Sequence, residues 1–191
     1  MPPTRKTIKL AFPPEGFRYQ KDIITPDEEN ELVKHIEALP LKEYEFQGYL
    51  AKRRTVSFGW HYKFGEESLA ITQPIPDFLQ PVRQRAAQVA GLRADDLPHI
   101  LVTEYSPGTP IGWHRDRPVF EDVIGISLVS RSLFRLRRRT KDAWERYTHI
   151  LDPRSVYLMR GAVRNEWEHS IPEVDALRYS ITFRSLRNGP R

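Results

Sequence analysis

The chain contains no cysteine among its 191 residues. Disulfide bonds, thiolate metal sites and cysteine nucleophiles are therefore excluded. The sequence also lacks any run of about 18 apolar residues, so we expect no membrane-spanning helix. No apolar segment follows the early basic residues Arg5, Lys6 and Lys9, so no signal peptide is predicted. Together these absences predict a cytoplasmic protein without a membrane partner.

Internal repeats and low-complexity tracts are absent as well. A chain of 191 residues with 39% hydrophobic residues can build one domain with a real core, so we expect a single domain over residues 1–191 and a monomer. The 30 basic and 25 acidic residues give a net charge of +5. This excess favours an anionic partner such as nucleic acid, although a merely basic surface explains it equally well.

The first predicted helix begins after Thr25, which can cap it. Pro26 suits the first helical position and Glu28 completes a capping box. Apolar residues at helical spacing over 32–39 give the helix a buried face, and Pro40 ends it. A second helix is expected over residues 76–90, before the left-handed turn that Gly91 allows.

After residue 98 the pattern changes to short strands spaced about 8–12 residues apart, which is typical of a double-sheet barrel or jelly roll. We therefore predict an α+β fold: a double-stranded β-helix (jelly roll) core over residues 99–186, with the N-terminal helices packed on one sheet. The expected strands are 99–105, 111–116, 123–129, 133–139, 148–151, 156–160 and 178–186.

His114 and Asp116 are candidate metal ligands. They lie two residues apart, so on a strand their side chains leave the same face. A histidine from another strand would complete two imidazoles and one carboxylate, the ligand set of non-haem iron(II) oxygenases. His169 is the preferred third ligand, and His149, in a strand-like segment, is the alternative.

The segment 178–184 alternates strictly at period two. Arg178, Ser180, Thr182 and Arg184 share one face of the expected strand, and the apolar residues share the other. Such a polar row is either a solvated outer face or an inward-facing wall that binds a carboxylate. Arginine suits the second role because its guanidinium binds a carboxylate through two parallel hydrogen bonds.

Four motifs occur in a fixed order: Tyr-x-Pro-Gly from Tyr105, His-x-Asp from His114, His-x-Ile from His169, and Arg-Tyr-x-Ile-Thr-Phe-Arg from Arg178. In this order and spacing they resemble the AlkB family of iron(II)- and 2-oxoglutarate-dependent dioxygenases. The resemblance is dense over residues 99–186. It implies that His114, Asp116 and His169 bind Fe(II), and that 2-oxoglutarate and O2 take the remaining metal positions.

The resemblance also implies a co-substrate site. Arg178 would bind the distal carboxylate of 2-oxoglutarate with help from the Tyr105 hydroxyl, and Arg184 would lie near the metal-proximal end. Two positions depart from the family pattern, since Thr103 and Ser180 stand where Asn is usual. Both can still hydrogen-bond the co-substrate, with a shorter reach.

The activity that the resemblance implies is oxidative removal of N-alkyl groups from nucleobases of alkylated DNA or RNA. Pro118 stands where prototype repair enzymes carry an acidic base-recognising residue, so their lesion preference does not carry over. Two alternatives remain: a dioxygenase of the same fold acting on a protein methyl-lysine or a small molecule, and a non-catalytic jelly-roll module that binds nucleic acid. The basic charge favours a nucleic-acid substrate.

Residues 44–64 are aromatic and basic and correspond to the substrate lid of such enzymes. We expect strands and hairpin loops there, with Gly48 and Gly59 at turns. Basic residues would meet phosphates while an aromatic ring stacks on a base, although Phe58 and Phe64 are expected in the core. The candidate substrate-binding residues are Arg53, Arg54, Trp60 and Tyr62.

A second basic run covers residues 131–139. Arg135, Arg137 and Arg139 share one face of the predicted strand with Leu133. This row is either a solvated sheet face or a surface that follows a nucleic-acid backbone. Salt-dependent binding would indicate the latter.

Overall fold

The computed structural model describes residues 6–46, 49–62 and 69–187, and only the backbone of residues 44–46, 49–51, 61–62 and 69–72. No helix in the described part is long and apolar enough to cross a membrane. The helices are α1 (Pro26–Glu37), α2 (Gln80–Ala90) and α3 (Ala162–Glu166). The strands are β1 (Lys6–Lys9), β2 (Phe17–Gln20), β3 (Lys42–Phe46), β4 (Tyr49–Tyr62), β5 (Leu69–Gln73), β6 (His99–Tyr105), β7 (Ile111–His114), β8 (Phe120–Leu128), β9 (Ser132–Arg139), β10 (Ala143–Leu151), β11 (Ser155–Met159), β12 (Glu168–Ile171) and β13 (Arg178–Leu186).

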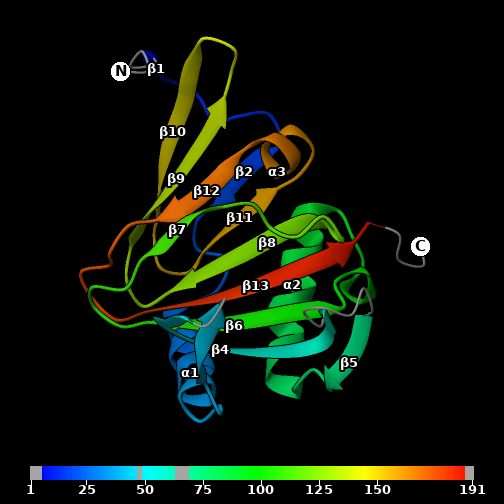
Figure 1. Ribbon diagram of the computed structural model, residues 1–191. Coiled ribbons are helices and arrows are strands. Elements are labelled where there is room, and N and C mark those ends of the chain that lie inside the picture. The colour runs from blue at the N-terminus through cyan, green and yellow to red at the C-terminus, as the bar shows by residue number, and fades with distance from the viewer. Residues whose placement is uncertain (1–5, 47–48, 63–68, 188–191) are drawn as a thin grey trace.

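Two sheets make up the fold (Figure 1). The major sheet has the order β2-β11-β8-β13-β6-β4-β3, with β5 paired to β4, and the minor sheet has the order β1-β10-β9-β12-β7. From β6 onward the chain passes repeatedly between the sheets, and neighbouring strands are antiparallel, as in a jelly roll. The predicted α+β jelly-roll fold is confirmed.

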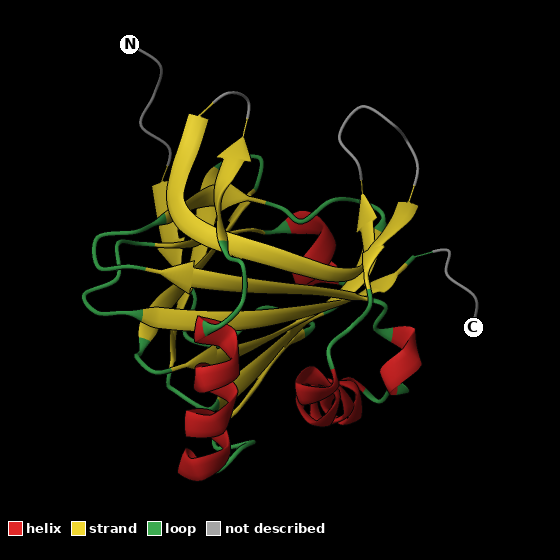
Figure 2. Cartoon of the chain, turned by 90° about the horizontal axis from the view of Figure 1, so that it is seen from below, coloured by secondary structure: helices red, strands yellow, loops and turns green. Residues whose placement is uncertain are grey.

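Helices α1 and α2 cover the outer face of the major sheet and lie on one side of both sheets (Figure 2). Their apolar faces pack against the side chains of Tyr179, Ile181 and Phe183 on β13. The capping box begins α1 as predicted: Thr25 Oγ1 accepts from the Glu28 amide, and Glu28 accepts from the Thr25 amide. The largest apolar core therefore lies between helices and sheet, not between the two sheets.

The opposite face of β13 points between the sheets and carries the polar row. Arg178, Ser180, Thr182 and Arg184 are all buried there. A smaller apolar cluster that includes Phe134 and Trp167 fills the rest of this interior. The interior between the sheets is therefore polar on the β13 side and apolar around Phe134 and Trp167.

Local structure differs from the sequence expectation at several places. Gly59 was expected in a turn but lies inside β4, with a positive φ of 75°. A β-carbon there would lie 2.0 Å from the carbonyl oxygen of Pro98, which precedes β6. Only glycine therefore allows the two backbones to approach so closely. The second helix begins with a 3-10 turn at Asp77–Leu79, and β10 starts five residues before the expected strand at 148. Gly48 lies outside the described residues.

Candidate metal centre

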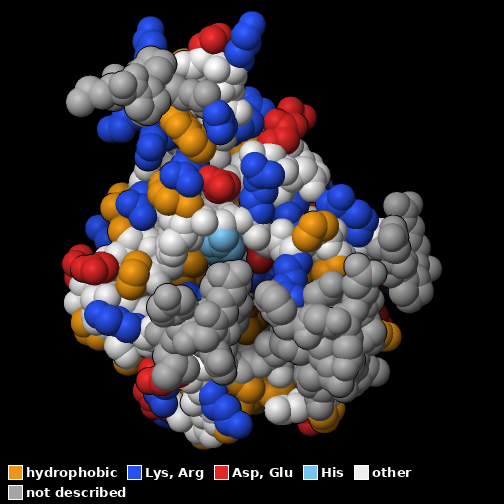
Figure 3. Space-filling model, viewed as in Figure 1, with side chains coloured by type: hydrophobic (Ala, Val, Ile, Leu, Met, Phe, Trp, Pro, Cys, Tyr) orange, Lys and Arg blue, Asp and Glu red, His pale blue; other side chains and the backbone are white. Residues whose placement is uncertain are grey.

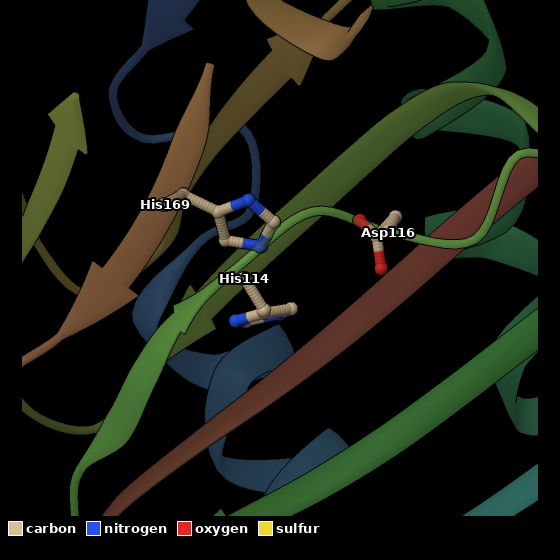
Figure 4. Close-up of side chains that lie close together, drawn as sticks. All are labelled: His114, Asp116 and His169. Carbon is tan, nitrogen blue, oxygen red and sulfur yellow. The ribbon is translucent and has the colours of Figure 1, made fainter. Parts of the chain in front are cut away.

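Three candidate ligands converge between the sheets (Figure 4). His114 ends β7, and His169 on β12 is its direct partner in the antiparallel pairing of the two strands. Asp116 lies in the loop that follows β7. One ligand atom from each residue lies within 4.8 Å of the others, so a single metal ion can bind all three.

Asp116 reaches the site by a route that differs from the prediction. The strand ends at His114, so the two side chains do not share a strand face. An ion pair places the carboxylate instead: Arg184 Nη2 donates to Asp116 Oδ1 at 2.9 Å, and both side chains are about nine-tenths buried. Asp116 Oδ2 is buried and has no hydrogen-bond partner among the described residues. A bound cation would satisfy this buried, unpartnered oxygen.

The ionisation states suit metal binding. Burial alone would raise the pKa of Asp116, but the charge of Arg184 and the two nearby imidazoles hold it well below its usual range. Burial and the neighbouring His114 lower the pKa of His169 to about 3, so its imidazole is neutral at pH 7. A carboxylate and a neutral imidazole are the forms that bind metals.

The ring of His114 has an assigned orientation. Its Nδ1 lies 2.9 Å from the carbonyl oxygen of Gly112, an acceptor that requires the proton on Nδ1. The Nε2 lone pair is then available to a metal. Such a hydrogen bond from the second ring nitrogen is the usual way in which proteins orient a ligating histidine.

His149, the alternative third ligand, lies elsewhere. Its Nδ1 is 3.0 Å from the hydroxyl of Tyr147, and its ring packs against Tyr19 with centroids 4.2 Å apart. It belongs to an aromatic cluster at β2 and β10, and it is not part of the three-residue ligand group. The structure thus brings His169, not His149, to His114 and Asp116.

Arg178 and Tyr105 lie side by side on paired strands β13 and β6. The Arg178 guanidinium carbon is 4.8 Å from the centre of the Tyr105 ring, and only 1% of the arginine is exposed. Its Nε donates to Ser127 Oγ at 3.1 Å, while Nη1 has no partner among the described residues. A buried guanidinium without a counter-charge is costly, so the site fits an anionic ligand such as the distal carboxylate of 2-oxoglutarate.

The other predicted co-substrate residues line the same interior. Thr103 and Ser180 are register partners on β6 and β13, and both are buried. Arg184 spans from Asp116 to His99, whose Nδ1 lies 3.3 Å from Arg184 Nη1. Arg184 therefore braces the carboxylate ligand directly, a contact that the sequence did not predict.

Sequence reasoning missed Ser127 on β8, the hydrogen-bond partner of Arg178. A signal was available, because Gly125 and Ser127 are the small residues at period two in the otherwise apolar segment 123–128. Both register with the polar row of β13: Gly125 opposite Thr182, and Ser127 opposite Ser180. Small residues on this face leave room for Arg178 and for the ring of Tyr157, which lies against Gly125.

The predicted lid residues divide. Arg54 forms a two-pronged ion pair with Glu104, with both N–O distances 2.7 Å, so its charge is paired across β4 and β6. Trp60 is 37% exposed, Arg53 is half-buried, and Phe58 is buried as expected. The side chain of Tyr62 and all of Phe64 lie outside the described residues.

Comparison with known proteins agrees with this geometry. Residues 16–184 match the model of the 2OG-Fe(II) oxygenase superfamily, whose chemistry uses Fe(II), 2-oxoglutarate and O2. The alkylated DNA repair protein ALKBH8 homolog of Arabidopsis thaliana is 27% identical over 92% of this chain, which spans 59% of that protein's length. The mouse alpha-ketoglutarate-dependent dioxygenase alkB homolog 4 is 25% identical over 92% of this chain and 69% of its own length. The structure of OsALKBH1 covers 91% of this chain and all of its own with a TM-score of 0.68 at 15% identity. The chain therefore belongs to the 2OG-Fe(II) oxygenase superfamily, in which it is an AlkB-like dioxygenase.

Proposed function

We propose that this enzyme oxidatively removes N-alkyl groups from nucleobases in DNA or RNA, with Fe(II) held by His114, Asp116 and His169. The observation that carries the proposal is that two buried charged groups in the same interior each have one polar atom without a partner among the described residues. Asp116 offers an unpartnered oxygen where a cation fits, and Arg178 offers an unpartnered N–H where a carboxylate fits. A non-catalytic binding module has no use for either.

Fe(II) with 2-oxoglutarate and O2 would supply the oxidising power: one oxygen atom of O2 would enter the succinate formed from 2-oxoglutarate with release of CO2, and the other would be inserted into a C–H bond of the N-alkyl group. The hydroxylated N-methyl group then breaks its C–N bond and leaves as formaldehyde. The chain's own residues orient the reactants. Arg178, stacked on Tyr105 and fixed by Ser127, binds the distal carboxylate. Arg184 keeps Asp116 ionised and pointed at the metal position.

A nucleic-acid substrate is supported by two features. The net charge is +5, and the relatives carry names that refer to alkylated DNA repair and, in the mouse ALKBH8 protein, to tRNA. We place Arg53 and Trp60 on the substrate side, since Trp60 presents the partly exposed ring that base stacking requires. Arg54 is left out because Glu104 neutralises it.

The test is an incubation with Fe(II), ascorbate and 2-oxoglutarate against N-methylated DNA and RNA oligonucleotides and a methyl-lysine peptide. We expect formaldehyde and succinate in equal amounts with at least one oligonucleotide, and none above background with the peptide. The His114→Ala variant is the matched control and should release neither product. Turnover of the peptide alone would move the enzyme to the protein-directed alternative.

A further inference from the structure

The outer face of the minor sheet is unusually rich in cations and indoles. Cross-strand register places the side chains on this face: Lys9 pairs with Arg146, and Arg146 pairs with Arg137. Trp144 and Arg139 form the adjacent pair on the same face. We define the cationic face as the residues Lys9, Trp113, Arg135, Arg137, Arg139, Trp144 and Arg146.

Three guanidiniums of the cationic face gather around one indole. The guanidinium carbons of Arg137, Arg135 and Arg146 lie 4.3, 5.1 and 5.9 Å from the centre of the Trp113 ring. Arg137 also lies 4.7 Å from the Trp144 ring, so it contacts both indoles. Guanidiniums stacked in this way keep their N–H edges available for phosphate oxygens.

This arrangement works against folding. Lys9, Arg146 and Arg137 are directly opposite one another across three strands, and like charges in such positions are destabilising. Within the described part of the chain, Glu168 is the one acid that pairs with them, through Arg137 at 2.6 Å. Among the described residues, Arg139 and Arg146 have no ion-pair partner, and Arg146 Nε is buried without a hydrogen bond. An anion bound across the row would relieve this repulsion.

The cationic face and the metal centre share two strands. Trp113 precedes His114 on β7, and Glu168 precedes His169 on β12, so these two side chains leave the strand faces opposite to the ligands. There Trp113 and Glu168 contact the arginines of the cationic face. Strand β7 is also the edge of the minor sheet. In Figure 3, Lys and Arg side chains gather over the strands of the minor sheet on the same side of the molecule where a histidine surface is visible. A chain lying on the cationic face can therefore cross the edge strand toward the site.

We propose that the cationic face binds the phosphate backbone of single-stranded nucleic acid and holds the strand whose alkylated base enters the metal centre. This inference rests on the proposed function. A single strand fits because its bases need no unpairing before one enters a site. Contacts to phosphates are independent of base sequence, so unmodified DNA and RNA should bind alike.

The test uses the variant Arg135→Gln/Arg139→Gln/Arg146→Gln and a 15-nucleotide oligothymidylate without any alkyl group. Each phosphate contact contributes about −0.7 to the slope of log affinity against log salt for a single strand. We expect the slope to become shallower by about 2, and the affinity at 0.1 M salt to fall about 100-fold. The control Lys21→Gln/Lys34→Gln/Arg93→Gln also lowers the net charge from +5 to +2, but outside the minor sheet, and should bind as the wild type does.

Turnover separates this inference from the proposed function. With an alkylated mononucleoside the triple variant should keep the wild-type rate, while its KM for an alkylated 15-mer rises in line with the lost affinity. If no alkylated base is a substrate but the variant still loses affinity for oligothymidylate, the cationic face is supported as a nucleic-acid site and the proposed function is contradicted. Wild-type affinity in the variant, or equal competition by a polyglutamate of the same charge, would overturn the cationic face as a nucleic-acid site.

Discussion

Replacing His169 with alanine is expected to abolish Fe(II) binding, whereas replacing His149 with alanine should leave it intact. His169 lies opposite His114 in the β12–β7 pairing, and His149 lies in a separate aromatic cluster. A ligand at 100 times its dissociation constant stabilises the folded state by about 2.7 kcal/mol. The measurement is therefore the shift in melting temperature on anaerobic addition of Fe(II), compared in each variant with its own metal-free protein.

Using each variant as its own reference removes the effect of the mutation on the metal-free fold. This matters because His149 also hydrogen-bonds Tyr147 and packs against Tyr19, so its loss lowers stability by itself. A metal-induced shift that survives in His169→Ala, or one that vanishes in His149→Ala, would mean that the ligand set is wrong.

The second large effect is expected at Arg178. In the Arg178→Met variant the KM for 2-oxoglutarate should rise on the order of 100-fold or more, because loss of one partner from a buried charge pair costs about 2–5 kcal/mol. The free energy of unfolding of the metal-free protein should instead stay equal or increase. Arg178 has 1% exposure and no ion-pair partner among the described residues, so in the empty site its charge costs stability.

Arg178→Lys is the matched control for the guanidinium fork. It keeps the charge but cannot form two parallel hydrogen bonds to one carboxylate, so its KM should lie between those of the wild type and the methionine variant. Urea unfolding supplies the stability measurement. A methionine variant that loses several kcal/mol of stability but retains 2-oxoglutarate affinity would show that Arg178 serves the fold and not the co-substrate.

Both predictions concern residues that the sequence indicated, His169 through the order of the motifs and Arg178 through strand periodicity as well. The polar row of β13 was visible because a strand alternates its faces, and register then places Arg178 beside Tyr105 and Ser180 beside Thr103. Sequence alone left two interpretations of that row open. Only the packing of the helices on Tyr179, Ile181 and Phe183 assigns the polar side to the interior.

The features that could not be predicted depend on contacts between distant segments. Spacing alone predicts Asp116 on a strand, but its position depends on an ion pair with Arg184, 68 residues away. Arg54 is a residue type that often contacts phosphates, yet Glu104 lies opposite it in β6 and forms an ion pair with it. Spacing within one segment carries no information about such partners.

The cationic face shows the same division. The sequence predicts that Arg135, Arg137 and Arg139 share one strand face. It does not predict that residues from three other strands join them: Trp113, Lys9 and Arg146. Arg138 in the same run turns to the opposite side and pairs with Glu145 and Glu166. A basic run therefore becomes a surface only when the sheet order is known.

The most direct test of the metal centre is a crystal soaked anaerobically with Fe(II) and 2-oxoglutarate and measured at the iron absorption edge. We expect one strong anomalous peak within bonding distance of His114, Asp116 and His169, with co-substrate density extending from it to the guanidinium of Arg178. An iron peak at other residues, or co-substrate density that does not reach Arg178, would contradict the account.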